Sequence, residues 1–168
     1  MTPRVAFAAV LVTLALTQAA ILPTAGFIGI KPDLVLVALL LWSMAREPRE
    51  GLLWAFAAGL FFGLLTLSRL GVDALALLPV VVIGWLSRSR FFRSGILFPL
   101  VMTLAATLAH DLTLAVATTL TGGYVSAAGL LRLGVLGALL NSLVVPPLYA
   151  IVYVLDGWVE RIEAHARA

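Results

Sequence analysis

Six apolar stretches follow one another along the chain, separated only by short links. They cover residues 5–22, 27–45, 52–67, 72–87, 96–120 and 130–155. A helix needs about 20 apolar residues to cross the hydrocarbon core of a bilayer. The links contain Gly, Pro and Arg, which are typical of turns between helices. The pattern predicts an all-α polytopic membrane protein, with about six transmembrane helices in a single membrane domain over residues 1–168.

The composition excludes an ordinary soluble domain. The chain is 62% hydrophobic and 11% charged, whereas soluble domains are about 45–50% apolar and about 25% charged. A soluble protein this apolar would expose large patches and aggregate. The net charge of +3 comes from basic residues between the apolar stretches. We therefore interpret them as topology signals and contacts with anionic membrane lipid, and we expect no nucleic-acid partner.

Cofactor chemistry has little support in the sequence. The chain has no cysteine and only two histidines, His110 and His165. This excludes disulfides, and two histidines alone do not make a histidine metal site. No arrangement of side chains with the spacing of a catalytic site is present, so we expect no catalytic residue and no cofactor.

The basic residues predict the orientation. With six spans, both termini lie on one side of the membrane. That side carries eight of the eleven basic residues, and Lys31, Arg69 and Arg132 lie on the other. Basic residues favour the cytoplasmic side, so both termini are expected in the cytoplasm. Trp42, Trp54, Trp85 and Trp158 each lie near a charged residue of that side, which suggests a common interface.

The two ends of the chain need separate interpretation. Arg4 precedes the first apolar stretch and small residues occur near Ala19, so this stretch could be a signal peptide. A retained first span is favoured because the rest of the chain is also membrane-embedded. Residues 156–168 are more polar, and Glu163 precedes Arg167 by four positions. That order favours a helical pair, which predicts a short helical cytoplasmic tail.

The second apolar stretch is short and has charged residues on both sides. Residues 34–45 carry no charge, and as a helix they rise about 18 Å, less than the about 30 Å of the hydrocarbon core. Pro32 suits the first position of a helix, and Asp33 suits the positive end of its dipole. We expect a helix from Pro32, with residues 26–30 as irregular backbone on the outer side. Asp33 then either borders an interface or is an ordinary helix cap. Pro48 should separate this helix from the next.

Three polar residues fall near the middle of predicted spans. These are His110 and Asp111 in the fifth span and Asn141 in the sixth. Polar groups at this depth are costly and usually face the bundle interior or water. They could form a proton relay or a substrate site, but we favour a hydrogen bond between the two spans. Asp111 should reach Asn141 or another polar group on a neighbouring span. Asp73, four residues after Arg69, is interpreted as an acid at a helix start.

Small residues recur on the third span. Ala55, Gly59 and Gly63 are spaced by four positions, which lets two helices approach closely. The spacing fits a contact inside the bundle and a contact with a partner subunit equally well.

A series of short motifs is more specific than the hydropathy. The chain reads P-D-L-V-L-V-A-L-L-L-W at residues 32–42, P-R-E-G at 48–51, A-A-G-L-F-F-G-L-L at 57–65 and L-G-V-D-A-L-A-L-L at 70–78. This series resembles the MreD family of bacterial rod shape-determining membrane proteins. The resemblance covers about residues 26–90, and length and span number also fit. Gly63 departs from it, because many relatives carry an aspartate near that position.

The resemblance implies a function and a fold. It implies a non-enzymatic component of the bacterial inner membrane that binds MreC, and through it a class B penicillin-binding protein, RodA and MreB, in cell-wall elongation. It also implies a fold similar to the substrate-binding subunits of energy-coupling-factor transporters. A small-molecule, vitamin-type transporter subunit is therefore the alternative. Such a site needs several convergent polar groups.

The orientation can be tested with reporter fusions. We expect a reporter that is active only in the cytoplasm to be active when fused after Ala168, because basic residues favour that side. Activity of a periplasm-specific reporter at the same position would contradict the orientation, and a fusion after Gly71 serves as the opposite-side control.

Overall fold

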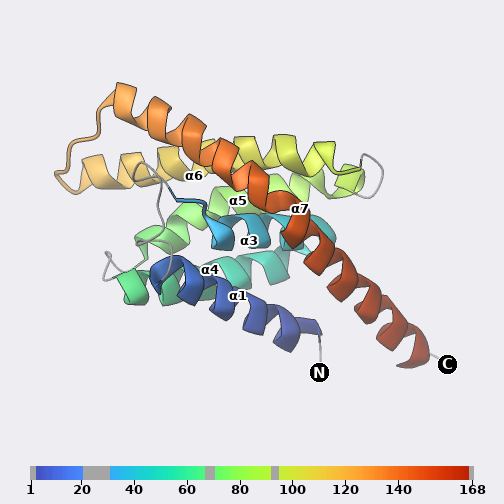
Figure 1. The fold of residues 1–168 in the computed structure, drawn as a ribbon. Coiled ribbons are helices and arrows are strands. Elements are labelled where there is room, and N and C mark those ends of the chain that lie inside the picture. The colour runs from blue at the N-terminus through green and yellow to red at the C-terminus, as the bar shows by residue number, and fades with distance from the viewer. Residues whose placement is uncertain (1–2, 21–30, 67–70, 92–94, 167–168) are drawn as a thin grey trace.

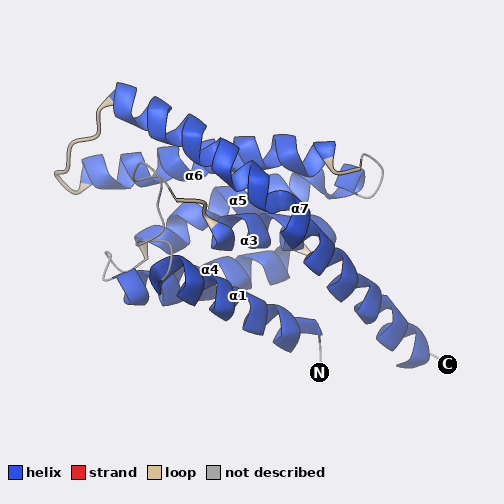
Figure 2. Ribbon diagram, viewed as in Figure 1, coloured by secondary structure: helices blue, strands red, loops and turns tan. Residues whose placement is uncertain are grey.

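The computed structural model describes residues 3–20, 31–66, 71–91 and 95–166. These residues form helices and turns, with no strand among them (Figure 2). The helices are α1 (Pro3–Ala20), α3 (Leu34–Ala45), α4 (Pro48–Thr66), α5 (Val72–Phe91), α6 (Leu97–Leu120) and α7 (Ala127–Ala166). The predicted all-α membrane fold is confirmed.

Helix α3 is the centre of the bundle. It contacts α1, α4, α5, α6 and α7, and in Figure 1 it lies between the pair α1 and α4 and the pair α6 and α7. Every residue from 35 to 45 is buried. A helix that is apolar on all sides is stable where other protein surrounds it. The short second stretch is thus an internal helix rather than a lipid-facing span.

Four of the described helices are long and apolar enough to cross a membrane. They comprise Pro48–Thr66, Val72–Ser89, Leu97–Leu120 and Ala127–Val154, whereas the apolar helices Arg4–Ala20 and Leu34–Ala45 are shorter.

The beginning of α1 and the end of α7 lie at the same end of the bundle (Figure 1). Arg4 also pairs with Glu50 at 3.4 Å, which places α1 beside the start of α4 at that end.

The boundaries of α3 differ from the expected ones at one end. The helix starts at Leu34 with Asp33 as its N-cap, so Pro32 precedes the cap and is not the first helical residue. Asp33 has an extended backbone and its side chain accepts a hydrogen bond from the Leu36 N–H, so the carboxylate defines the start. Residues 26–30, the expected irregular segment, lie outside the described residues. At the other end, Arg46 is the C-cap and α4 starts at Pro48, as predicted.

Trp42 is not an interface residue. Its side chain is 1% exposed and stacks on the Phe7 ring of α1, with 3.9 Å between ring centroids. The Arg46 guanidinium lies 5.6 Å from the Trp42 ring centroid, within reach of a cation–π contact. The expectation that Trp42 belongs to an interfacial belt is therefore wrong, because the position of α3 inside the bundle buries it.

The small residues of α4 make a contact inside the bundle. Ala55, Gly59 and Gly63 are buried. A Cβ atom on Gly59 would lie 2.3 Å from the Ala74 Cα of α5. The sequence left open whether Gly59 contacts a helix of the same bundle or a partner subunit. The structure shows that it packs closely against α5 of the same bundle.

The last helix is longer than the predicted span. It runs from Ala127 to Ala166 without interruption and contains Pro146 and Pro147. The predicted helical tail is a direct continuation of the sixth span.

Replacing Gly59 tests the packing of α4 on α5. We expect Gly59→Ala to lower the free energy of unfolding by about 1–3 kcal/mol, because the added methyl meets the backbone of Ala74. Thermal unfolding in detergent measures the change. Gly137→Ala is the control, because an added Cβ there meets nothing within 4 Å. Equal stability of the two variants would contradict this contact.

Candidate functional site

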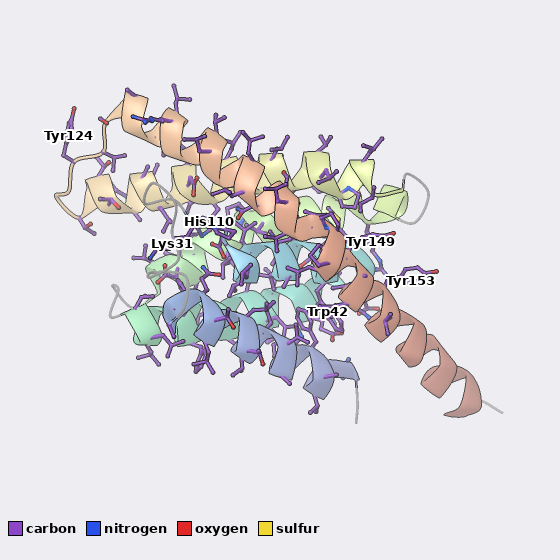
Figure 3. All side chains as sticks on the ribbon, in the orientation of Figure 1. Lys31, Trp42, His110, Tyr124, Tyr149 and Tyr153 are labelled. Atoms are coloured by element: carbon purple, nitrogen blue, oxygen red, sulfur yellow. The ribbon has the colours of Figure 1, made fainter. Side chains whose placement is uncertain are left out.

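A cavity of about 610 Å³ lies beside the start of α3. Residues from α1, α3, α4, α6, α7 and the connection between α6 and α7 line it. Its polar lining residues are Gln18, Lys31, Asp33, Thr66, Thr107, His110, Asp111, Thr118, Tyr124, Ser126 and Asn141. Figure 3 shows Lys31 and His110 close together toward this end of the bundle, with Trp42 toward the other.

Asp33 and Gln18 together provide hydrogen-bond partners for N–H groups in the first turn of α3. The Asp33 Oδ1 atom accepts hydrogen bonds from the Leu36 N–H at 2.9 Å and from the Gln18 Nε2 atom at 3.1 Å. The Gln18 Oε1 atom in turn accepts from the Val35 N–H at 3.2 Å. The first N–H groups of a helix have no partner within the helix. The carboxylate and the amide supply two of these partners and tie α1 to α3.

Asn141 completes this network from α7. Its Oδ1 atom accepts a hydrogen bond from the Asp33 N–H. Its Nδ2 atom donates to the Thr107 hydroxyl of α6 at 2.9 Å. The Asn141 side chain is 1% exposed. Water cannot reach it, so its polar atoms need hydrogen-bond partners within the protein. A single amide thereby joins α3, α6 and α7.

His110 lies between two carboxylates. Its Nδ1 atom is 3.3 Å from the Asp111 Oδ1 atom, and its Nε2 atom is 4.0 Å from the Asp33 Oδ2 atom. The side chains of His110, Asp33 and Asp111 are 10%, 23% and 27% exposed. The imidazole thus bridges the start of α3 and the middle of α6.

The expected hydrogen bond between the fifth and sixth spans is present, but with a different partner. Asn141 bonds to Thr107 rather than to Asp111. Asp111 bonds to His110 on its own helix, because the imidazole lies over the neighbouring carboxylate. Asp111 lines the cavity, so it faces the bundle interior as expected. The expectation that it bonds to Asn141 or to another polar group on a neighbouring span is wrong for the described residues, because its hydrogen-bond partner is His110.

The other residues predicted from the sequence lie in different parts of the fold. Pro32 lines the cavity one position before the cap. Gly59 and Gly63 lie in the interior of the bundle. Asp73 lies in the first turn of α5, as an acid at a helix start does. Pro32, Asp33, His110, Asp111 and Asn141 line the cavity, and Gly59, Gly63 and Asp73 do not.

Gln18 and Thr107 belong to the site but were not predicted from the sequence. Gln18 is the only amide side chain in the first apolar stretch, and a polar amide in a membrane span usually faces protein. That signal could have found it. Thr107 carried no comparable signal, because threonine often bonds to a carbonyl of its own helix.

Residues 2–155 match the family described as rod shape-determining protein MreD. The chain belongs to this family. The match includes every residue that lines the cavity, so the cavity is part of the family domain. The family gives the chain a role in determining rod shape, and its apolar helices make it an integral membrane protein. Neither a curated protein nor a solved structure matches the chain. The likeness to energy-coupling-factor subunits therefore stays a prediction.

Removing the Asn141 amide tests the network. We expect Asn141→Ala to lower the free energy of unfolding by about 1–3 kcal/mol, because the Asp33 N–H and the Thr107 hydroxyl lose their partner. Unfolding in detergent measures the effect.

The neighbouring Ser142 provides the control. Its hydroxyl donates to the Ala138 carbonyl of its own helix, and Ser142→Ala should change the free energy of unfolding by less than about 0.5 kcal/mol. Equal losses in the two variants would show that the Asn141 bonds do not stabilise the bundle.

Proposed function

We propose that the chain is a non-enzymatic scaffold of the cell-wall elongation machinery, which binds MreC and supports peptidoglycan synthesis. The observation that carries the proposal is the match of residues 2–155 to the MreD family. Through MreC the chain would meet a class B penicillin-binding protein, RodA and MreB. The machinery lies at the bacterial inner membrane, which is the proposed location.

The network around Asp33 suits a scaffold. Hydrogen bonds between Asp33 and the side-chain amides of Gln18 and Asn141 fix α1 and α7 against α3, and the Asn141 bond to Thr107 adds α6. Such bonds hold helices in one arrangement, and a preorganised surface binds a partner at a lower entropic cost. The outer faces of α6 and α7 remain apolar, with Leu112, Val116, Leu139 and Leu143 all more than half exposed. A membrane helix of a partner can pack against such faces.

We also propose that both termini face the cytoplasm. The support is the excess of basic residues on one side. The pair between Arg4 and Glu50 agrees with it, because it places the first helix and the turn before α4 at one end.

A second function is favoured by the cavity. Small-molecule sites commonly measure about 300–1,000 Å³ and combine apolar walls with a few polar groups. The cavity of about 610 Å³ has this size and such a lining. A substrate-binding subunit of a small-molecule transporter is therefore the second candidate.

Affinity purification in mild detergent separates the two candidates. We expect MreC to co-purify with the parent chain, because the family match points to the elongation machinery. Co-purification of transporter ATPase subunits without MreC would overturn the scaffold and support the transporter.

Variants at Asp33 then test whether the start of α3 belongs to the interface. Asp33→Asn keeps an oxygen that can accept from the Leu36 N–H, whereas Asp33→Leu removes it. We expect Asp33→Asn to reach the parent's membrane level and to retain MreC. For Asp33→Leu we expect a lower membrane level and an equal fractional decrease in the amount of MreC that co-purifies. If both variants accumulate normally but lose MreC, the carboxylate contacts the partner. If both accumulate and keep MreC, Asp33 is only a helix start.

A further inference from the structure

Each carboxylate in the cavity has one oxygen that accepts hydrogen bonds and one that accepts none from the described residues. The Asp33 Oδ1 atom accepts from Leu36 and Gln18, and its Oδ2 atom lies 4.0 Å from the His110 Nε2 atom, beyond hydrogen-bond distance. The Asp111 Oδ1 atom is engaged by His110. The Asp111 Oδ2 atom faces Gly134, whose added Cβ would lie 3.4 Å away. Among the described residues, neither Oδ2 atom receives a hydrogen bond.

These oxygens determine the charge that the cavity can accept. An ionised carboxylate only accepts hydrogen bonds, so its partner must be a donor. A charge that is partly removed from water needs an opposite charge or several donors nearby. Lys31 is the one lysine or arginine of the described lining, and it is exposed. The other basic group of this lining is the His110 imidazole beside the two carboxylates. The half-buried part of the cavity therefore favours a cation and disfavours an anion.

The rest of the lining limits the shape of that cation. Leu36, Phe62 and Leu114 contribute apolar surface beside the carboxylates. A cavity of about 610 Å³ exceeds what an isolated inorganic ion needs. The described residues also provide no group of three His, Cys, Asp or Glu that could hold a metal. The lining suits a positively charged group at the end of a short apolar chain.

We propose that this cavity binds an ammonium or guanidinium group at the Oδ2 atoms of Asp33 and Asp111, beside the His110 imidazole that lies between the two carboxylates. Its apolar chain would lie against Leu36, Phe62 and Leu114. Such a group donates several hydrogen bonds and carries the complementary charge. A free organic amine can supply it, and so can a lysine or arginine side chain of a membrane partner. Only the second source rests on the proposed scaffold function.

Binding of simple probes to the purified full-length chain tests the site. In phosphatidylcholine nanodiscs, n-butylguanidinium and n-butylammonium should bind and raise the melting temperature. Butyrate and n-butanol at the same concentrations should not, because they have the same apolar chain without the positive charge. Equal binding of the cations and butyrate, or no binding of the cations, would falsify the proposal.

Two variants locate the site. Asp111→Asn should weaken n-butylguanidinium binding at least about tenfold, because it removes one of the two charges. Gly134→Ala keeps the carboxylate and adds a methyl group in van der Waals contact with its Oδ2 atom. The methyl covers one side of that oxygen, so this variant should weaken binding even if Asp111→Asn folds poorly. The control is Glu50→Gln, which removes a carboxylate paired with Arg4 outside the cavity. Loss of binding in Glu50→Gln, or unchanged binding in both cavity variants, would place the cation elsewhere and overturn the assignment.

The complex with MreC identifies the source of the cation. If the purified complex no longer binds n-butylguanidinium, a basic side chain of the partner occupies the cavity. If it binds the probe as the isolated chain does, the site takes a free amine. Both outcomes support the cation site, and failure of MreC to co-purify would remove only the partner's side chain as a source.

Discussion

Helix α3 begins inside the bundle, where its first N–H groups must find partners within the protein. Three side chains provide them: Asp33 from the cap itself, Gln18 from α1, and Asn141 from α7, which accepts from the Asp33 N–H. An unpaired amide in such surroundings costs about 1–3 kcal/mol. The need to cap one short helix therefore fixes the mutual positions of helices that are far apart in the sequence. The cavity lies beside this cap, where these polar groups converge.

The sequence predicted the helices well because burial in lipid or protein leaves long apolar runs. Arg46 and Pro48 also marked the turn between α3 and α4 correctly. It could not show that α3 is surrounded by protein, because uniformly apolar residues look alike in lipid and in a protein core. The burial of Trp42 follows from the same position and was missed for the same reason.

The candidate site was predicted only in part. His110, Asp111 and Asn141 were found because polar groups are rare at membrane depth. Their partners were not, because Asn141 meets Asp33 across 108 positions and no local pattern encodes such a distance. Gln18 was overlooked although it stands alone among apolar neighbours. In apolar spans, an isolated amide is best treated as half of a pair whose other half lies on another helix, as Gln18 and Asn141 show.

The enclosure of α3 has a consequence for the lipid around the protein. A helix that touches lipid must match the thickness of the membrane, or it tilts and deforms the bilayer at some energetic cost. Helix α3 contacts α1, α4, α5, α6 and α7 instead, so its 12 residues are exempt from that requirement. The adjustment to membrane thickness therefore falls on the outer helices, and Gln18 of α1 and Asn141 of α7 tie two of these helices to the start of α3. A change in their tilt thus reaches the site through the same hydrogen bonds that hold the bundle together.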